Sequence, residues 1–145
     1  MYTYRYPHPA VAADCVVIAN DGTASWLLLI RRGNAPFKGC WAFPGGFMNI
    51  DEEASQCARR ELREETGLTI DKLYQVGAYS DPDRDPRERV ISIVYLALID
   101  ERITVAGDDD ASEARWFPLD ELPELAFDHG TILRDALKLA ATLQS

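Results

Sequence analysis

The length, composition and charge of this chain restrict what it can be. It has 145 residues, of which 47% are hydrophobic and 27% charged, which is typical of a globular protein and predicts one domain over residues 1–145. Fifteen basic and 24 acidic side chains leave a net charge of −9. No overall electrostatic attraction therefore favours DNA, RNA or an anionic membrane, and an anionic substrate would need metal ions to reverse the local charge.

The first half of the chain is predicted to form three strands and a helix. Apolar runs at residues 14–20 and 25–31 are separated by Asn-Asp-Gly-Thr, a pattern typical of two strands joined by a turn. A short strand at 41–43 ends in a Pro-Gly-Gly turn. A helix follows over residues 51–66, and Gly67 stands where the end of a helix favours a left-handed residue.

The second half is predicted to add three strands and a last helix. A strand lies within residues 68–79, and the nearly all-apolar run at 90–99 is typical of a buried strand. The polar, proline-containing stretch at 80–89 between them indicates a loop. A short strand at 114–117 precedes a helix over 128–143, which Asp128 can cap. Many strands with two separated helices indicate a mixed α/β sandwich.

Cysteine usage and hydropathy predict where the chain works. The three cysteines are an odd number without C-x-x-C spacing, so a disulfide framework and a structural zinc site are not expected. The first residues lack the apolar segment of a secretion signal, and the apolar runs are too short to span a bilayer. These features predict a cytoplasmic protein that does not enter membranes.

Three carboxylates follow one side of the helix at 51–66. At about 100° per residue, Glu61, Glu64 and Glu65 fall within about 100° of arc and continue the stripe of Cys57 and Ala58, which should face the protein body. Like charges at this spacing repel, and burial increases the cost. A divalent cation removes both penalties, and hard oxygen ligands favour Mg²⁺ or Mn²⁺ over zinc. The alternative is that arginines from a neighbouring element neutralise the carboxylates.

A motif covers these carboxylates. Gly46 is followed after five residues by Glu52, and after seven more by Arg-Glu-Leu-Arg-Glu-Glu-Thr-Gly-Leu at residues 60–68. The stretch matches the Nudix box, G-x5-E-x7-R-E-U-x-E-E-x-G-U, at every defined position, so the chain resembles the Nudix hydrolases. The resemblance implies a Nudix-type α/β/α sandwich around a mixed β-sheet. It also implies Mg²⁺-dependent hydrolysis of a nucleoside diphosphate linked to another moiety, and a bracing ion pair between Glu52 and Arg60.

The same resemblance assigns roles within the box. It makes Glu61, Glu64 and Glu65 the catalytic, metal-binding carboxylates and the Gly46 carbonyl an additional metal ligand. Metal ions suit this chemistry because a pyrophosphate repels the attacking water until its oxygens are neutralised.

The group that takes the proton of the attacking water stays open at this point. Glu61 is one candidate, and an acidic residue from a later loop, among Asp109, Asp110 and Glu113, is another. The acidic run at residues 108–110 also fits an ordinary solvated turn.

Segments outside the box resemble the bacterial ADP-ribose pyrophosphatase branch of the family. They are the motifs Tyr6-Pro-His-Pro-Ala-Val11 with Asp14, Arg31-Arg32, Trp41-Ala-Phe-Pro-Gly-Gly-Phe47, Ser80-Asp-Pro-Asp-Arg-Asp-Pro-Arg87 and Phe127-Asp-His129. This resemblance implies that ADP-ribose is cleaved to AMP and ribose 5-phosphate.

Four side chains are predicted to bind the substrate. Arg84 and Arg87 lie in the loop at 80–89 and can reach phosphate or ribose oxygens. Strand alternation sends only one of Arg31 and Arg32 inward, and Arg32 is the candidate. His129 is expected to reach a ligand from the start of the last helix, although a surface histidine in a capping turn fits equally well.

Two other functions are compatible with the sequence. One is a nucleoside-triphosphate pyrophosphohydrolase that removes damaged or excess nucleotides. The other is a non-catalytic module that senses ADP-ribose, as in regulators that carry a Nudix-like domain, but this reading expects an appended DNA-binding segment and a less acidic charge. The expected partner is a small-molecule nucleotide, with no nucleic acid and no membrane, and a homodimer is possible by resemblance.

Overall fold

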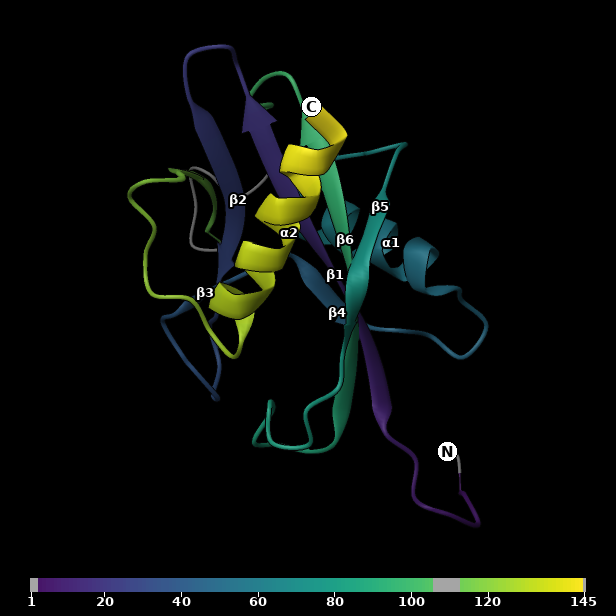
Figure 1. The fold of residues 1–145 in the computed structure, drawn as a ribbon. Coiled ribbons are helices and arrows are strands. Elements are labelled where there is room, and N and C mark those ends of the chain that lie inside the picture. The colour runs from purple at the N-terminus through teal and green to yellow at the C-terminus, as the bar shows by residue number, and fades with distance from the viewer. Residues whose placement is uncertain (1–2, 106–112, 145) are drawn as a thin grey trace.

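The computed structural model describes residues 3–105 and 113–144. The described chain forms a seven-stranded sheet and two helices. Figure 1 labels both helices and strands β1 to β6. The strands are β1 (Ala10–Asn20), β2 (Ser25–Arg31), β3 (Trp41–Ala42), β4 (Gly45–Phe47), β5 (Tyr74–Tyr79), β6 (Val90–Ile99) and β7 (Ala114–Pro118), and the helices are α1 (Ala54–Thr66) and α2 (His129–Gln144).

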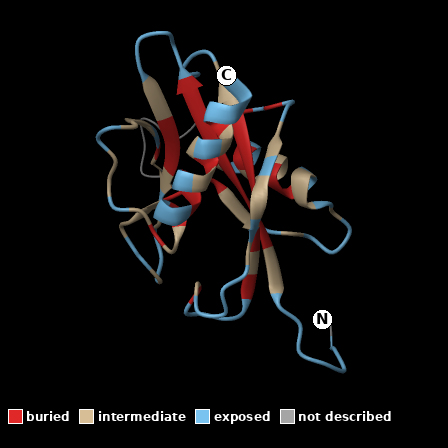
Figure 2. Ribbon diagram, viewed as in Figure 1, coloured by how far each residue is buried: buried red, intermediate tan, exposed pale blue. Residues whose placement is uncertain are grey.

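The sheet is mixed, as predicted. Its main path runs β3-β2-β1-β6-β5, with β4 paired to β1 and β7 paired to β2. The central β1 and β6 are parallel along ten residue pairs, from Ala10 opposite Val90 to Ala19 opposite Ile99. The remaining strand pairs named here are antiparallel. The central strands are buried on both faces (Figure 2), which agrees with their nearly continuous apolar sequences.

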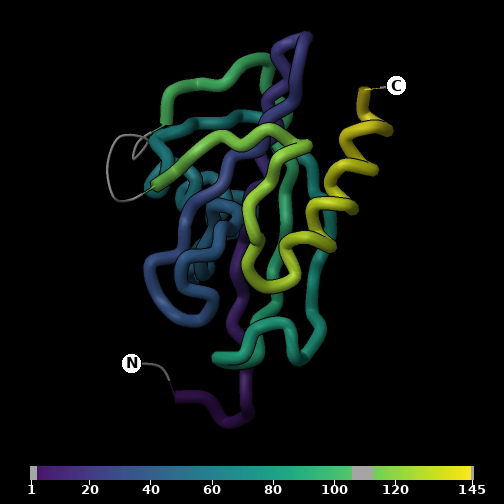
Figure 3. The backbone as a smooth tube through the Cα atoms, turned by 90° about the vertical axis from the view of Figure 1, so that its left-hand side faces the viewer, coloured from purple at the N-terminus to yellow at the C-terminus, as the bar shows by residue number. Residues whose placement is uncertain are grey.

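A helix covers each face of the sheet. On β1, Val16 and Ile18 point into the core cluster that contains Ile132 of α2. Cys15 and Val17, one residue out of phase, point into the cluster that contains Leu62 of α1. Figures 1 and 3 show α2 lying along one side of the sheet. The predicted α/β/α sandwich is therefore confirmed, with the period-two alternation of β1 supplying both cores.

Helix α1 begins three residues later than predicted and ends as predicted. The Glu53 N–H donates to Gln56 Oε1 at 2.8 Å, which caps the start of the helix. Gly67 ends it at φ 80°, where its N–H bonds the Arg63 carbonyl. Residues before Glu53 form a turn instead, in which the Asn49 N–H donates to the Glu52 carboxylate at 3.0 Å.

Two strand predictions need correction. The strand expected at 14–20 already begins at Ala10, because the stretch before Asp14 pairs with both β4 and β6. The glycine turn expected after residue 43 contains a strand of its own, β4. Both errors concern segments whose pairing partners are distant in sequence.

The expectations about cysteines and membranes were tested only in part. Cys15, Cys40 and Cys57 are free thiols. Within residues 3–105 and 113–144, no helix is both long and apolar enough to cross a membrane.

Candidate active site

Two glycines bring the start of β4 against β1 and α1. Gly45 lies opposite Asp14 in the sheet, and a Cβ there would collide with the Asp14 carboxylate and come within 2.6 Å of the Ala13 carbonyl oxygen. A Cβ on Gly46 would come within 2.5 Å of the Glu61 carboxyl group. Because neither glycine has a side chain, carboxylates from two elements approach the same short strand.

Arg60 binds the acidic groups of the box together. Its guanidinium donates to both oxygens of Glu52, at 2.6 and 3.0 Å, and to the Phe47 carbonyl at 3.1 Å. The same group contacts Glu61 at 3.0 Å and Glu64 at 3.2 Å. The predicted ion pair between Glu52 and Arg60 is present, and it ties the loop before α1 to the helix.

The three carboxylates of α1 do not all face the body of the protein. The Glu61 side chain is 17% exposed, and Glu65 accepts a hydrogen bond from the Gly45 N–H at 2.8 Å. The Glu64 side chain is 56% exposed. The prediction of an inward-facing set is therefore wrong for Glu64. The buried stripe of α1 is Cys57, Ala58, Leu62 and Thr66, so its centre is rotated away from Glu64.

Burial raises the pKa of two carboxyl groups beside β4. Burial raises the pKa of Glu65 to about 8. The hydrogen bond from the Gly45 N–H opposes this rise, whereas the charges of Glu61 and Asp14 add to it. The pKa of Asp14 is raised to about 7, again mainly by burial, and the Arg84 guanidinium opposes this rise. Both carboxyl groups are thus costly to ionise without a nearby cation.

This donor set fits a hard divalent cation in chemistry. Carboxylate oxygens and a backbone carbonyl are ligands that Mg²⁺ and Mn²⁺ prefer, and Glu61 lies directly against Gly46. As the side chains stand, however, no three acidic, histidine or cysteine groups of the described residues converge closely enough to hold a metal ion. Glu61 and Glu64 are instead held by Arg60.

A cavity of about 170 Å³ opens beside these groups. All four predicted substrate-binding residues line it, namely Arg32, Arg84, Arg87 and His129. Glu65, Asp14 and Gly46 line it as well. The folded chain therefore brings the predicted basic residues and part of the acidic box to one place.

Arg84 is committed to the protein rather than free to move. Its side chain is only 4% exposed. The guanidinium forms a bidentate pair with Asp128 at 2.7 and 2.9 Å and donates to Ser92 at 2.9 Å. The expectation of a loop arginine free to reach its ligand is therefore wrong for Arg84. Since the Asp128 carboxylate binds this guanidinium, its predicted role as a helix cap is replaced by an ion pair.

Arg32 and Arg87 lie over the ring of Phe127 at the cavity. The guanidinium carbon of Arg32 is 4.9 Å from the ring centroid, and that of Arg87 is 5.7 Å away. Arg32 also donates to the Pro36 carbonyl at 2.7 Å, and Arg87 pairs with the buried Asp85 at 2.7 Å. These contacts orient both arginines while leaving Arg87 41% exposed.

The remaining candidates differ in position. His129 is buried and lines the cavity, so the alternative of a surface histidine is wrong. Glu113 does not line the cavity and pairs with Arg31 at 3.6 Å, which agrees with Arg31 pointing away from Arg32. Asp109 and Asp110 lie outside the described residues.

Comparisons with known proteins agree with this geometry. A model of the NUDIX domain matches residues 8–136. The chain belongs to the Nudix family. It is 47% identical over 136 residues to the ADP-ribose pyrophosphatase of Methanocaldococcus jannaschii, covering 93% of this chain and 78% of that protein. It is also 33% identical to the ADPR responsive transcriptional repressor NtrR of Acinetobacter baylyi, covering 90% of this chain but only 54% of the repressor.

Solved Nudix structures have the same fold. A MutT/nudix family protein from Enterococcus faecalis matches with a TM-score of 0.87 at 30% identity, over 98% of this chain and 66% of that one. The NUDIX domain of Shewanella oneidensis NrtR, solved with ADP ribose, matches at 0.82 and 27% identity over 93% and 90%. A bifunctional NMN adenylyltransferase/ADP ribose pyrophosphatase from Francisella tularensis, solved with AMP and a manganese ion, matches at 0.77 and 29% identity over 93% and 43%.

Sequence reasoning assigned no role in the site to several residues that surround the Nudix box. Asp14, Ser92 and Phe127 line the cavity, and Asp128 holds Arg84. Two of them carried a local signal, because Asp14 and Ser92 are polar residues inside otherwise apolar strand segments. A polar residue in a buried strand needs a partner, and here both lie at the cavity.

Proposed function

We propose that this chain is a Nudix pyrophosphatase that cleaves ADP-ribose into AMP and ribose 5-phosphate with Mg²⁺ or Mn²⁺. The observation that carries the proposal is the cavity in which Arg32, Arg84 and Arg87 gather beside Glu65 and the Gly46 backbone. An anionic diphosphate suits the arginines, and a cation suits the carboxylates. The ADP-ribose pyrophosphatase that is 47% identical supports the choice of substrate.

The residues of the chain divide the work of binding and reaction. Arg87 and Arg32, held over Phe127, bind phosphate oxygens, while the buried Arg84, paired with Asp128, forms a fixed part of the cavity wall. Glu61 accepts a proton from the attacking water. The water oxygen bonds to phosphorus, and the bridging P–O bond breaks so that the other phosphate leaves with the bridging oxygen.

The box supplies the ligands for the cation. Glu61, Glu64, Glu65 and the Gly46 carbonyl would hold it, and for this Glu61 and Glu64 must give up contacts with Arg60. When bound, the cation neutralises phosphate oxygens and lowers the pKa of a water ligand. The Francisella relative solved with a manganese ion supports this assignment.

Product analysis tests the proposed activity. Purified protein is incubated with ADP-ribose, NADH, sugar nucleotides or nucleoside triphosphates, each with Mg²⁺, with Mn²⁺ and with EDTA, and kcat/KM values are ranked. We expect AMP and ribose 5-phosphate from ADP-ribose and no reaction in EDTA. Pyrophosphate released most efficiently from a triphosphate would instead identify a nucleotide clean-up enzyme.

A second candidate is binding of ADP-ribose without hydrolysis. Two observations favour it, namely the identity of 33% to a transcriptional repressor and the similarity to a NUDIX domain solved with ADP ribose. The contacts of Arg60 with Glu61 and Glu64 are also compatible with a site that holds no cation. Tight binding with no product under either metal would select this function.

The proposed partners follow from charge and from the predicted site. We propose a small-molecule nucleotide as ligand, no nucleic acid because the net charge is −9, a homodimer, and a cytoplasmic location. Light scattering after size-exclusion chromatography tests the dimer, and a shift assay with duplex DNA tests the second expectation. A mass equal to one chain would contradict the proposed homodimer. Binding to DNA at physiological salt would contradict the proposal that the chain binds no nucleic acid.

A further inference from the structure

His129 is a buried polar residue with a defined aromatic environment. It is the first residue of α2 and only 4% exposed. Its imidazole stacks on the Phe43 ring at a centroid distance of 4.5 Å and an interplanar angle of 15°, and the Phe127 ring lies 5.6 Å away. The same residue lines the cavity beside the Nudix box. The stacking on Phe43 therefore holds the ring in a defined orientation at the cavity wall.

The hydrogen bonds of His129 determine which nitrogen carries its proton. The Phe43 N–H donates to Nδ1 at 3.2 Å, so Nδ1 is the unprotonated nitrogen, and a neutral imidazole must then carry its hydrogen on Nε2. Burial keeps the ring neutral by lowering its pKa to about 4, although the Asp128 charge acts in the opposite direction. Nε2–H is thus a fixed, uncharged donor.

This donor has no acceptor in the described part of the chain. Nε2 forms no hydrogen bond with any described residue. Among the described residues, the side-chain nitrogen or oxygen that is fully buried and unpaired is Trp26 Nε1. His129 Nε2 therefore keeps some contact with solvent. An unpaired donor in a residue more than nine-tenths buried costs free energy unless a ligand or water accepts its hydrogen bond. Because His129 lines the cavity, a ligand held there can accept this hydrogen bond.

The size and lining of the cavity indicate which part of the substrate it takes. Its volume of about 170 Å³ lies below the roughly 300–1,000 Å³ of pockets that enclose whole drug-sized ligands. It can therefore enclose only part of an ADP-ribose molecule. Asp14, Ser92 and Glu65 line it together with His129, and a hydroxyl group can accept from Nε2–H while donating to a carboxylate.

We infer that the cavity takes the terminal ribose and that His129 selects it by donating from Nε2 to a ribose hydroxyl oxygen. The inference rests on the proposed function, which supplies a substrate with such a ribose. It makes His129 a substrate-binding residue for the sugar and leaves the AMP half outside its reach.

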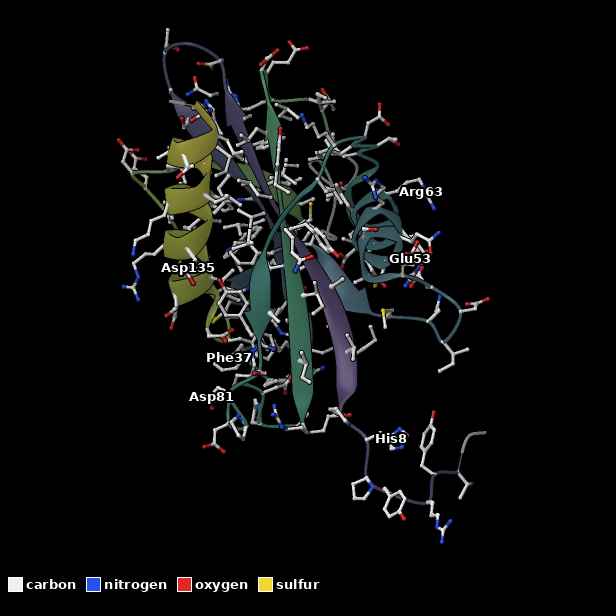
Figure 4. All side chains as sticks on the ribbon, turned by 45° about the vertical axis from the view of Figure 1, so that its right-hand side comes forward. His8, Phe37, Glu53, Arg63, Asp81 and Asp135 are labelled. Atoms are coloured by element: carbon white, nitrogen blue, oxygen red, sulfur yellow. The ribbon has the colours of Figure 1, made fainter. Side chains whose placement is uncertain are left out.

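Two substitutions separate the donor from the fold. His129→Asn keeps an acceptor near Nδ1 for the Phe43 N–H and removes the donor, whereas His129→Gln places an amide N–H near Nε2. The matched control is His8→Asn, which changes the other histidine. His8 lies on the N-terminal segment, as Figure 4 shows, and it is not among the residues that line the cavity. Thermal melting confirms that each variant is folded.

The readout is calorimetric binding of each product, ribose 5-phosphate or AMP, with Mg²⁺, which does not depend on turnover. We expect His129→Asn to weaken ribose 5-phosphate about three- to tenfold, the value of one neutral hydrogen bond, and to leave AMP within twofold. His129→Gln should recover most of the loss, and His8→Asn should match the wild type. Unchanged ribose 5-phosphate affinity in folded His129→Asn, a loss confined to AMP, or a wild type that binds no ribose 5-phosphate would overturn the inference. Failure of the proposed function is read separately, from wild-type hydrolysis of ADP-ribose.

Discussion

Replacing Gly46 by alanine tests whether Glu61 must lie where the structure places it. The added Cβ would come 2.5 Å from the Glu61 carboxyl group, whereas ordinary contacts begin near 3.4 Å. The carboxylate must therefore retreat by about 1 Å, and a misplacement of that size can cost about a hundredfold in rate. Because only the end of a flexible side chain is displaced, we expect unfolding free energy to change by less than about 1 kcal/mol.

Two neighbouring glycines supply the controls. A Cβ on Gly45 would come within 2.6 Å of the Ala13 carbonyl oxygen and 2.8 Å of the Asp14 Cα, which are backbone atoms that cannot move alone. Gly45→Ala should cost about 1–3 kcal/mol, or about 3–9 °C in melting temperature. A Cβ on Gly33 would meet nothing within 4 Å, so Gly33→Ala should preserve both stability and activity.

The assay combines differential scanning calorimetry with AMP release from ADP-ribose in Mg²⁺. We expect Gly46→Ala to melt near the wild type and to lose about a hundredfold in kcat/KM. Activity within threefold of the wild type in folded Gly46→Ala would refute the reasoning, since Glu61 could then act from another position. A melting temperature as low as that of Gly45→Ala would show that the clash reaches the backbone.

Three further predictions concern single side chains. Glu64→Gln should reduce turnover at least about a hundredfold if Glu64 holds the cation. The melting temperature should stay nearly unchanged, because the side chain is 56% exposed. Full activity would exclude a role of Glu64 in holding the cation. Arg84→Met should lower the unfolding free energy in urea by about 1–3 kcal/mol, because it leaves the half-buried Asp128 carboxylate without its partner. The exposed Arg63→Met should change it little, and equal effects would contradict the pairing. Burial lowers the pKa of His129 from 6.5 to about 4, so the folded chain binds fewer protons than the unfolded chain between these pH values. The stability that comes from neutral His129 is therefore complete above pH 6.5 and is lost toward pH 4. The difference in unfolding free energy between wild type and His129→Asn should shrink by about 3 kcal/mol across this window, and a constant difference in urea titrations would disprove a buried neutral ring.

The local features of the active-site helix could be predicted from the sequence. The Nudix box identified its acidic residues, and Gly67 ends it in the left-handed conformation expected. The facing of the acidic side chains was only partly predictable. The stripe was centred on Glu61, whereas the core takes Ala58, Leu62 and Thr66. Which arc of a helix faces the core depends on the strands that it packs against, and periodicity alone does not give this angle.

The contacts that complete the cavity lie beyond local sequence reasoning. Arg84 binds Asp128 across 44 positions, and the Phe43 N–H binds His129 across 86. A motif shows that such residues carry functional chemistry, but not whether they are free or already paired. A free Arg84 or His129 would be a mobile surface group, whereas the paired residues found here are fixed parts of the wall of the site. Ion pairing and burial depend on topology, which places distant segments side by side.

The parallel pairing of β1 with β6 has a consequence for how the protein is made. Each of the ten residues from Ala10 to Ala19 pairs with a residue of β6 that lies 80 positions further along the chain, as Ala10 does with Val90. During synthesis the ribosome must therefore release most of the chain before the middle of the sheet can close, and such non-local pairing is intrinsically slow. Until then the apolar residues of β1 and β2 are without their final neighbours, and this is the interval in which a nascent chain most needs chaperones.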